Sequence, residues 1–407
     1  KSVYVVRVDD HGRRLLKAYE LKDNTLDVRF GTTALNSRAV EEGNLPTMTC
    51  PYTVEQVNNL IADGYDVKNG LTYLNQYNSY STLDAYNKLP LLCGGTIAVV
   101  SDTQNALNTY VYEYYTKGPA QQDWQPYTEV YNPITGPGIV KVVVADGGYL
   151  KYNNQNIVGM DIIVASGGTL ELNNCFNMGD NARLIVMPGG TVVDKTTYGY
   201  SLQNNAASSL VYIGGTLKDM RSFLLNVGTT YIAETGLLTG NEINFANADG
   251  VMTNWGKIEV DRIIGNGNQG TINNGCLLRS GEKIQVNILN QNANTALECN
   301  EIYTNNITLR NNSIVRSKNL NMNGNGAYIA YVGTDESSAL ISTQKITLAS
   351  ATTYKKPAHL YIEANEYADT NTSWGLDHSG VNNAKVGESK FAIFPAYKGE
   401  ELEKADC

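Results

Sequence analysis

The sequence predicts a mainly β fold in which short coils of chain stack into a solenoid. Apolar, β-branched runs recur, a Gly-Gly step follows each of them, and the pair returns at an interval of roughly 20–25 residues, the range of solenoid coils. A single coil cannot bury its own apolar face, whereas stacked copies share one continuous core.

Four copies of the repeat define the coil, and each reads as a strand, a glycine turn, a second strand and a polar turn. The copies occupy residues 142–154, 162–174, 184–194 and 211–219. β-Branched residues favour strands, and glycine turns the chain at positive φ without steric cost, so we expect Gly148 and Gly168 to hold such a φ. We also expect one core row of residues that share an offset after the turn, namely Leu150, Leu170, Val192 and Leu217.

Further glycines continue the spacing towards the C-terminus. They are Gly236, Gly256 and Gly275, and looser echoes follow up to Ser350. This pattern predicts about ten coils from Ile139 onwards. A β-sandwich with glycine-rich hairpins is the alternative, which the regular spacing disfavours.

The strands before the glycine pairs are apolar at successive positions, unlike the alternating strands that follow the pairs. If one set of these side chains faces the core, the other set faces outwards and includes Val143, Ile163 and Ile185. Stacked apolar side chains of this kind are usually covered. We therefore expect the N-terminal region, the C-terminal segment or a second subunit to cover them, with tolerated surface residues as the alternative.

The chain outside the repeat predicts two further parts. The expected ranges are 1–135 for a small α+β N-terminal domain or cap, 136–350 for the solenoid, and 351–407 for a short C-terminal cap or β module. A cap covers the open edge of a terminal coil.

The N-terminal part contains a hairpin signal and a helix signal. Residues 2–8 and 15–21 are strand candidates on either side of a turn. Thr53 and Gln56 fit a capping box, which predicts a helix from Val54 to about residue 62. Gly64 would end this helix, and its predicted apolar face consists of Val54, Val57, Leu60 and Ile61.

Composition limits the possible partners. The net charge is −9, charged residues make up 17% of the chain and no basic stripe occurs, so we do not expect a nucleic-acid partner. No apolar run is long enough to span a membrane. Tyr (27) greatly outnumbers Phe (6), and surfaces rich in Tyr and Asn suit contacts with a polysaccharide or a surface protein.

The six cysteines are too scattered for a disulfide framework. Pairing of Cys50 with Cys93 is one possibility. We expect Cys175, Cys276 and Cys299 to pack as small apolar side chains inside the solenoid.

Catalytic signals are weak, and no catalytic residue is predicted. The three histidines match no metal spacing, and neither a nucleophile elbow nor a phosphate-binding loop occurs. The best acidic cluster is Glu259 with Asp261, facing Arg262 or Arg279. A solvated strand edge is the alternative for this cluster.

A calcium-loop pattern begins at Asp369 and reaches Asp377, but Trp374 occupies the position that needs glycine. Gly380 also replaces the bidentate glutamate of that pattern. A loop built of Asx turns is therefore the default, and we expect neither a metal nor a cofactor.

The predicted ligand-binding residues are aromatic. Alternation places three tyrosines of residues 110–115 on one strand face, and two further aromatic residues follow in a turn-rich linker. The candidates for stacking on sugar rings are Tyr110, Tyr112, Tyr114, Trp124 and Tyr127. A strand that packs this face onto its own domain is the alternative.

The repeat resembles the coils of right-handed parallel β-helix proteins, over about residues 139–350. In its A-x-G-G-x-L turns and its Asn- and Tyr-rich composition the chain also resembles secreted or lipid-anchored surface proteins of gut Bacteroidetes. The resemblance implies a non-enzymatic, extracellular role in adhesion, glycan or protein binding, or as a spacer, with outer-membrane anchoring through a removed N-terminal segment. A carbohydrate-active β-helix enzyme, a polysaccharide lyase or glycoside hydrolase, is the alternative.

Overall fold

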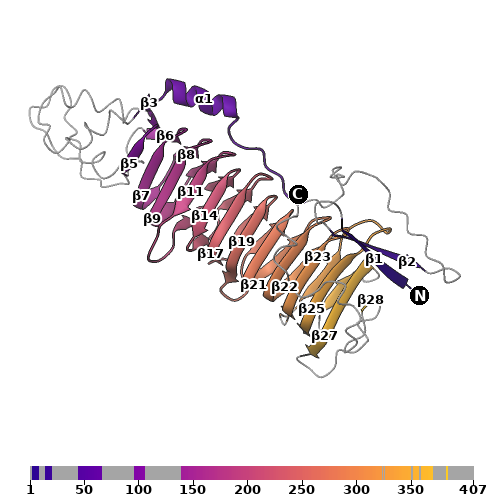
Figure 1. Cartoon of the computed structure of the whole chain (residues 1–407). Helices are drawn as coiled ribbons and strands as arrows, with labels where there is room; N and C mark the ends of the chain where they lie inside the picture. Colours follow the sequence, from indigo (N-terminus) through magenta and orange to yellow (C-terminus); the bar gives the residue numbers. More distant parts are fainter. Residues whose placement is uncertain are drawn as a thin grey trace, which may run out of the picture. The chain divides into compact units, whose positions relative to one another are not determined.

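The computed structural model describes residues 2–8, 14–20, 45–66, 96–105, 139–322, 324, 326–349, 352–356, 359–369 and 382–383. The protein is mainly β and forms a parallel β-solenoid of about 11 turns (Figure 1), which confirms the predicted fold class. The chain divides into two compact units, one of Met48–Ala246 and one of Lys1–Thr47 with Asn247–Cys407.

The first unit, Met48–Ala246, begins with one helix and continues as short strands. The elements are α1 (Val54–Asp63), β3 (Tyr65–Asp66), β4 (Thr96–Val100), β5 (Thr103–Asn105), β6 (Ile139–Val144), β7 (Tyr149–Ile157), β8 (Asp161–Val164), β9 (Thr169–Met178), β10 (Arg183–Val186), β11 (Thr191–Asp194), β12 (Leu202–Asn204), β13 (Leu210–Ile213), β14 (Thr216–Met220), β15 (Phe223–Leu225), β16 (Thr229–Ile232) and β17 (Leu237–Phe245). Equivalent strands of neighbouring coils pair in parallel, as β6 does with β8 and β8 with β10.

The predicted core row is confirmed. In register, Leu150 lies beside Leu170, Leu170 beside Val192, and Val192 beside Leu217. All four side chains are fully buried. Each of the four residues lies at the same offset after its turn. Parallel pairing in register therefore places these apolar side chains next to one another in successive coils.

In the first two glycine pairs it is the first glycine, and not the predicted second one, that holds positive φ. Gly147 and Gly167 hold positive φ, at 74° and 77°, whereas Gly148 and Gly168 do not. A Cβ at Gly148 would lie 2.0 Å from the backbone oxygen of Val100, in the previous coil. The first glycine therefore supplies the conformation, and the second allows the close approach of stacked coils.

The segment Met48–Gly64, here called the cover segment, contains α1 and packs on the outward apolar side chains. α1 contacts β4 and β6, and the Cys50 thiol lies 3.6 Å from the Met187 sulfur. Val143, Ile163 and Ile185 are fully buried. The expectation that these residues are covered is therefore confirmed, and of the three covers left open by the sequence these contacts favour the N-terminal region.

The helix matches its sequence signals at both ends. Thr53 and Gln56 form both hydrogen bonds of the capping box, and Gly64 follows the last helical residue. Val57 is buried, but Val54 is 65% exposed, so the predicted apolar face is wrong at Val54. Val54 is the first residue of the helix, and the one buried residue of the helix, Val57, lies one turn further on.

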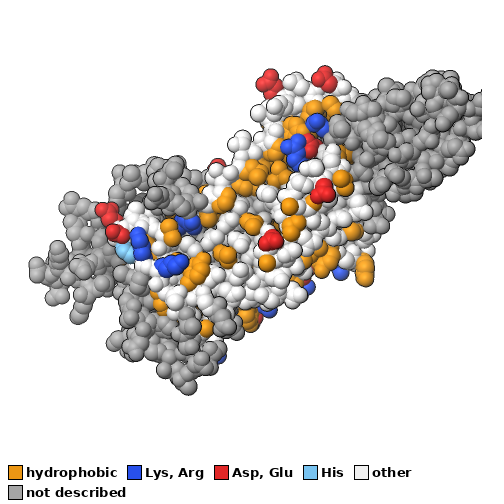
Figure 2. All heavy atoms as spheres, turned by 180° about the vertical axis from the view of Figure 1, so that it is seen from behind, with side chains coloured by type: hydrophobic (Ala, Val, Ile, Leu, Met, Phe, Trp, Pro, Cys, Tyr) orange, Lys and Arg blue, Asp and Glu red, His pale blue; other side chains and the backbone are white. Residues whose placement is uncertain are grey.

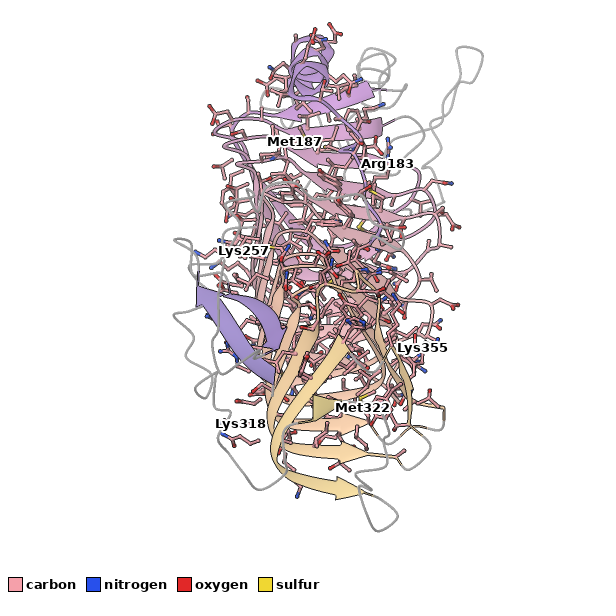
Figure 3. The ribbon with its side chains drawn as sticks, turned by 90° about the vertical axis from the view of Figure 1, so that its right-hand side faces the viewer. Arg183, Met187, Lys257, Lys318, Met322 and Lys355 are labelled. Carbon is pink, nitrogen blue, oxygen red and sulfur yellow. The ribbon has the colours of Figure 1, made fainter. Side chains whose placement is uncertain are left out.

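A three-residue network fixes the cover segment to the coils. Arg183 is the first residue of β10, and Met187 follows the last residue of this strand (Figure 3). Arg183 binds the Asp161 carboxylate with Nε and Nη2, and the Tyr52 hydroxyl donates to the same carboxylate. Burial, together with this hydrogen bond, raises the pKa of the Tyr52 phenol above its usual value.

The second unit holds the remaining strands. They are β1 (Ser2–Val8), β2 (Arg14–Glu20), β18 (Val251–Asn254), β19 (Lys257–Gly265), β20 (Thr271–Asn274), β21 (Leu277–Gln291), β22 (Ala296–Leu309), β23 (Ile314–Met322), β24 (Tyr328–Tyr331), β25 (Ala339–Leu348), β26 (Thr353–Lys355), β27 (Leu360–Asp369) and β28 (Asn382–Asn383). β1 and β2 form the predicted antiparallel hairpin, and β18 to β28 pair in parallel.

Side-chain amides replace part of the apolar core in the second unit. Asn254 donates to Asn274 at 2.8 Å, and Asn274 donates to the Gln291 amide oxygen at 2.9 Å. All three residues are fully buried. These amides bond to one another from coil to coil, which lowers the cost of burying them, although the Gln291 Nε2 atom has no hydrogen-bond partner among the described residues.

Parallel pairing extends beyond the predicted solenoid range, since β4 pairs with β6 and β27 pairs with β25. The three predicted domain ranges stay a prediction.

Cys50 has a free thiol, so its predicted pairing with Cys93 is wrong. Cys276 is buried but disulfide-bonded, and is thus not merely a packing residue.

Candidate functional site

The predicted acidic cluster is a part of a row of alternating charges. Glu259 and Arg279 lie in register on β19 and β21, with an N–O distance of 4.0 Å. Asp261 and Arg262 are exposed and follow a shift in register, so they do not line up with this pair. The carboxylate of Glu259 is thus engaged by a neighbouring arginine.

The row continues through two residues that sequence reasoning missed. Arg279 lies in register with Glu298, and Glu298 with Arg316. The Glu298–Arg316 ion pair has an N–O distance of 2.5 Å, and the two side chains are 2% and 7% exposed. A carboxylate that is both buried and paired cannot meet a polymeric substrate, so this row is better explained as cross-coil pairing.

The predicted aromatic site lies outside the described residues, which holds for Tyr110, Tyr112, Tyr114, Trp124 and Tyr127 alike. The calcium-loop pattern also lies outside them, except Asp369. Within the described ranges, no group of three or more His, Cys, Asp or Glu side chains is placed to hold a metal ion. No helix in that part of the chain is long and apolar enough to cross a membrane.

The described surface carries a different pair of exposed aromatic side chains. Tyr198 is 84% exposed and Tyr200 is 39% exposed. They lie in the loop of residues 195–201 between β11 and β12, here called the tyrosine loop. Gly199 separates them and holds a φ of +72°, which turns the chain between the two rings.

A buried carboxylate holds the base of the tyrosine loop. Asp194 is 5% exposed and accepts hydrogen bonds from the backbone amides of Thr196, at 2.7 Å, and Arg221, at 2.6 Å. Ionised carboxylates make strong bonds to backbone N–H groups. Asp194 therefore ties the start of the loop to the next coil.

Both neighbouring coils brace the loop. On one side, the Thr196 hydroxyl accepts from the backbone N–H of Asn174 at 3.0 Å. On the other, Arg221 Nε donates to the Gly199 oxygen at 3.3 Å, between the two tyrosines. The backbone of Ser201 closes the loop by donating to the Ser222 oxygen at 2.9 Å. Exposed rings on a braced loop need less ordering when a ligand binds.

Basic side chains lie in the tyrosine loop and on the next coil. Lys195, Lys218 and Arg221 are exposed, and Asp219 is the one exposed carboxylate among residues 195–201 and 216–221. On the face seen in Figure 2, charged side chains are few among the described residues, in line with their 17% share of the sequence. The arrangement offers ring faces for stacking and cations for polar recognition.

The tyrosine loop has one signal in the sequence, the length of its coil. The step from Gly190 to Gly215 is longer than the step from Gly148 to Gly168, so this coil holds extra residues. Such additions map to loops on the surface of a solenoid. Comparison with protein-family models, with curated proteins and with solved structures found no match to this chain.

Proposed function

We propose that the protein is an extracellular, non-enzymatic binding protein whose tyrosine loop contacts saccharide rings. The observation that carries this proposal is the exposure of Tyr198 and Tyr200 on a loop that Asp194 and Arg221 hold in place. Large aromatic side chains are normally buried, and an exposed pair with polar neighbours is typical of a contact surface. Location at the cell surface and anchoring at an outer membrane belong to the same proposal.

Binding is favoured over cleavage by the side chains near the loop. Glycoside hydrolysis generally needs two carboxyl groups on either side of the scissile bond. Asp219 is the one exposed carboxylate in residues 195–201 and 216–221. The neighbouring Asp194 is buried, and its carboxylate accepts hydrogen bonds from two backbone amides. The loop therefore has the features of a binding surface without the acid pair.

The test is a polysaccharide panel, scored for retention of the protein and for release of new reducing ends. We expect retention without cleavage by at least one polysaccharide. Tyr198→Ala with Tyr200→Ala should weaken it about 5- to 100-fold, at roughly 0.5–1.5 kcal/mol per ring. Val158→Ala, a change at another exposed apolar side chain, is the matched control. Retention that the tyrosine changes leave intact would reject the proposal.

A further inference from the structure

The tyrosine loop stands out by charge as well as by aromatic exposure. The chain as a whole has a net charge of −9, yet three exposed cations, Lys195 in the loop and Lys218 and Arg221 on the next coil, face one exposed carboxylate, Asp219, in the same two segments. None of the three cations forms an ion pair in the part of the chain that the structure describes. Their charges are thus available to a ligand.

Of the three cations, Arg221 is the one that hydrogen bonds tie to the tyrosine loop and its base. Its Nε donates to the oxygen of Gly199, the residue between the two tyrosines. Its backbone amide is bound to the buried Asp194 carboxylate, which fixes the start of the side chain. Because Nε is engaged, the two terminal nitrogens of the exposed guanidinium remain as donors for a ligand. Such a pair of donors matches a carboxylate or sulfate in two-point contact.

The two lysines extend the positive surface over adjacent coils. Lys218 lies on β14 in register with Val193 of β11, and Lys195 follows β11 directly. Neighbouring parallel strands are about 4.8 Å apart, so these cations lie within reach of one short stretch of polymer. A row of cations next to stacking rings suits a ligand with regularly spaced negative charges.

We infer that the ligand of the tyrosine loop is an anionic saccharide, one that bears carboxylate or sulfate groups. This inference rests on the proposed function. Tyr198 and Tyr200 supply ring contacts that do not depend on charge, and Arg221 with the two lysines selects the anionic form. The interaction is electrostatic at a solvent-exposed surface, so added salt weakens it.

Matched pairs of polymers test the inference. Polygalacturonate is compared with its methyl-esterified form, and dextran sulfate with dextran, because each pair shares a backbone and differs in charge. We expect the protein to bind one anionic member at least tenfold more tightly than its neutral partner. The pair that shows the difference tells carboxylate from sulfate. Arg221→Gln should remove most of the difference, whereas Lys318→Gln, at an exposed lysine elsewhere, should not.

The outcomes separate the two claims. Equal binding of neutral and anionic polymers that is lost with Tyr198→Ala and Tyr200→Ala overturns the charge selectivity and leaves saccharide binding standing. Anionic binding that falls equally with Lys318→Gln and Arg221→Gln is non-specific and also overturns the inference. Binding that does not depend on the two tyrosines, or no binding to any polymer, overturns the proposed function and the inference together.

Discussion

Arg183 holds the carboxylate of Asp161 from the neighbouring coil in a two-point contact. The distances are 2.6 Å from Nε to Oδ1 and 2.5 Å from Nη2 to Oδ2. Asp161 is nearly buried, while Arg183 is 39% exposed. Because Tyr52 donates to the same carboxylate, this pair links two coils and the cover segment at one point.

Loss of Arg183 should therefore destabilise the first unit. Arg183→Leu leaves the Asp161 carboxylate with the Tyr52 hydroxyl alone, and we expect the free energy of unfolding to fall by about 1–3 kcal/mol. Chemical denaturation measures the change, with Lys318→Leu as a control at an exposed site. Equal unfolding midpoints for Arg183→Leu and the native chain would show that the network adds nothing.

The covered apolar side chains give a second prediction. Ile163 is fully buried beneath the cover segment, so Ile163→Ser should lower the free energy of unfolding by roughly 2–4 kcal/mol through lost burial and a new buried hydroxyl. Val251→Ser is the control, because Val251 is 37% exposed. If both changes have the same small effect on the melting temperature, the cover segment does not bury Ile163 in solution.

The two glycines of one turn should respond differently to substitution. Gly147 holds positive φ with open space around its Cα, so Gly147→Asn should be nearly neutral. Gly148→Ala should cost about 2 kcal/mol or more, because its Cβ would overlap the Val100 oxygen. Thermal unfolding of the two variants decides the point, and the opposite ranking would contradict the assigned roles.

High pH should weaken the packing of Tyr212. Burial, and then the neighbouring Cys50 thiol, raise the pKa of Tyr212 to about 12. An unfolded tyrosine loses its proton near pH 10, whereas Tyr212 in the folded chain keeps its proton up to about pH 12. Between these two pH values the unfolded chain therefore binds fewer protons than the folded chain. The free energy of unfolding therefore falls as the pH rises through this window, and the contribution is fully present below it.

Denaturation at several pH values from 9 to 12 measures this effect. Tyr212→Phe keeps the ring that stacks on Tyr231, at a centroid distance of 5.7 Å, and removes the titrating hydroxyl. We expect the variant to lose less stability than the native chain over the window. Identical slopes would mean that Tyr212 titrates normally in the folded protein.

Local pattern was sufficient to predict the repeating part of the fold. The offset of Leu150 and Leu170 after their glycine pairs defined a core row because parallel coils pair residues of equal offset. The same reasoning holds for Thr53 and Gln56, whose capping box depends on contacts within one turn of chain.

Contacts between distant segments could not be predicted in this way. The pattern showed that Ile163 and Ile185 needed a cover, but left open which of three parts would supply it. Glu298 and Arg316 form a buried ion pair across neighbouring strands, and no periodicity in the sequence reports such a pair. The second glycine of each pair is likewise required by the neighbouring coil and not by its own φ.

The candidate site was missed for a related reason. Residues 195–201 interrupt the repeat, and a longer alternating run of aromatic residues elsewhere in the chain gives a stronger sequence pattern than Tyr198 and Tyr200 do. Exposure distinguishes Tyr198 from a buried tyrosine such as Tyr212, and exposure is a property of the folded chain. The extra length of the coil was the one available signal.

Tyrosine nitration, followed by mass spectrometry, tests most directly whether saccharides bind at the tyrosine loop. In the free protein Tyr198 should react fastest, because its side chain is 84% exposed, and Tyr212 should react slowly at 6% exposed. When a retained polysaccharide is bound at saturation, we predict that Tyr198 and Tyr200 become protected while Tyr212 keeps its slow rate. Unchanged nitration of Tyr198 and Tyr200 with the polysaccharide bound would contradict the assignment of the site.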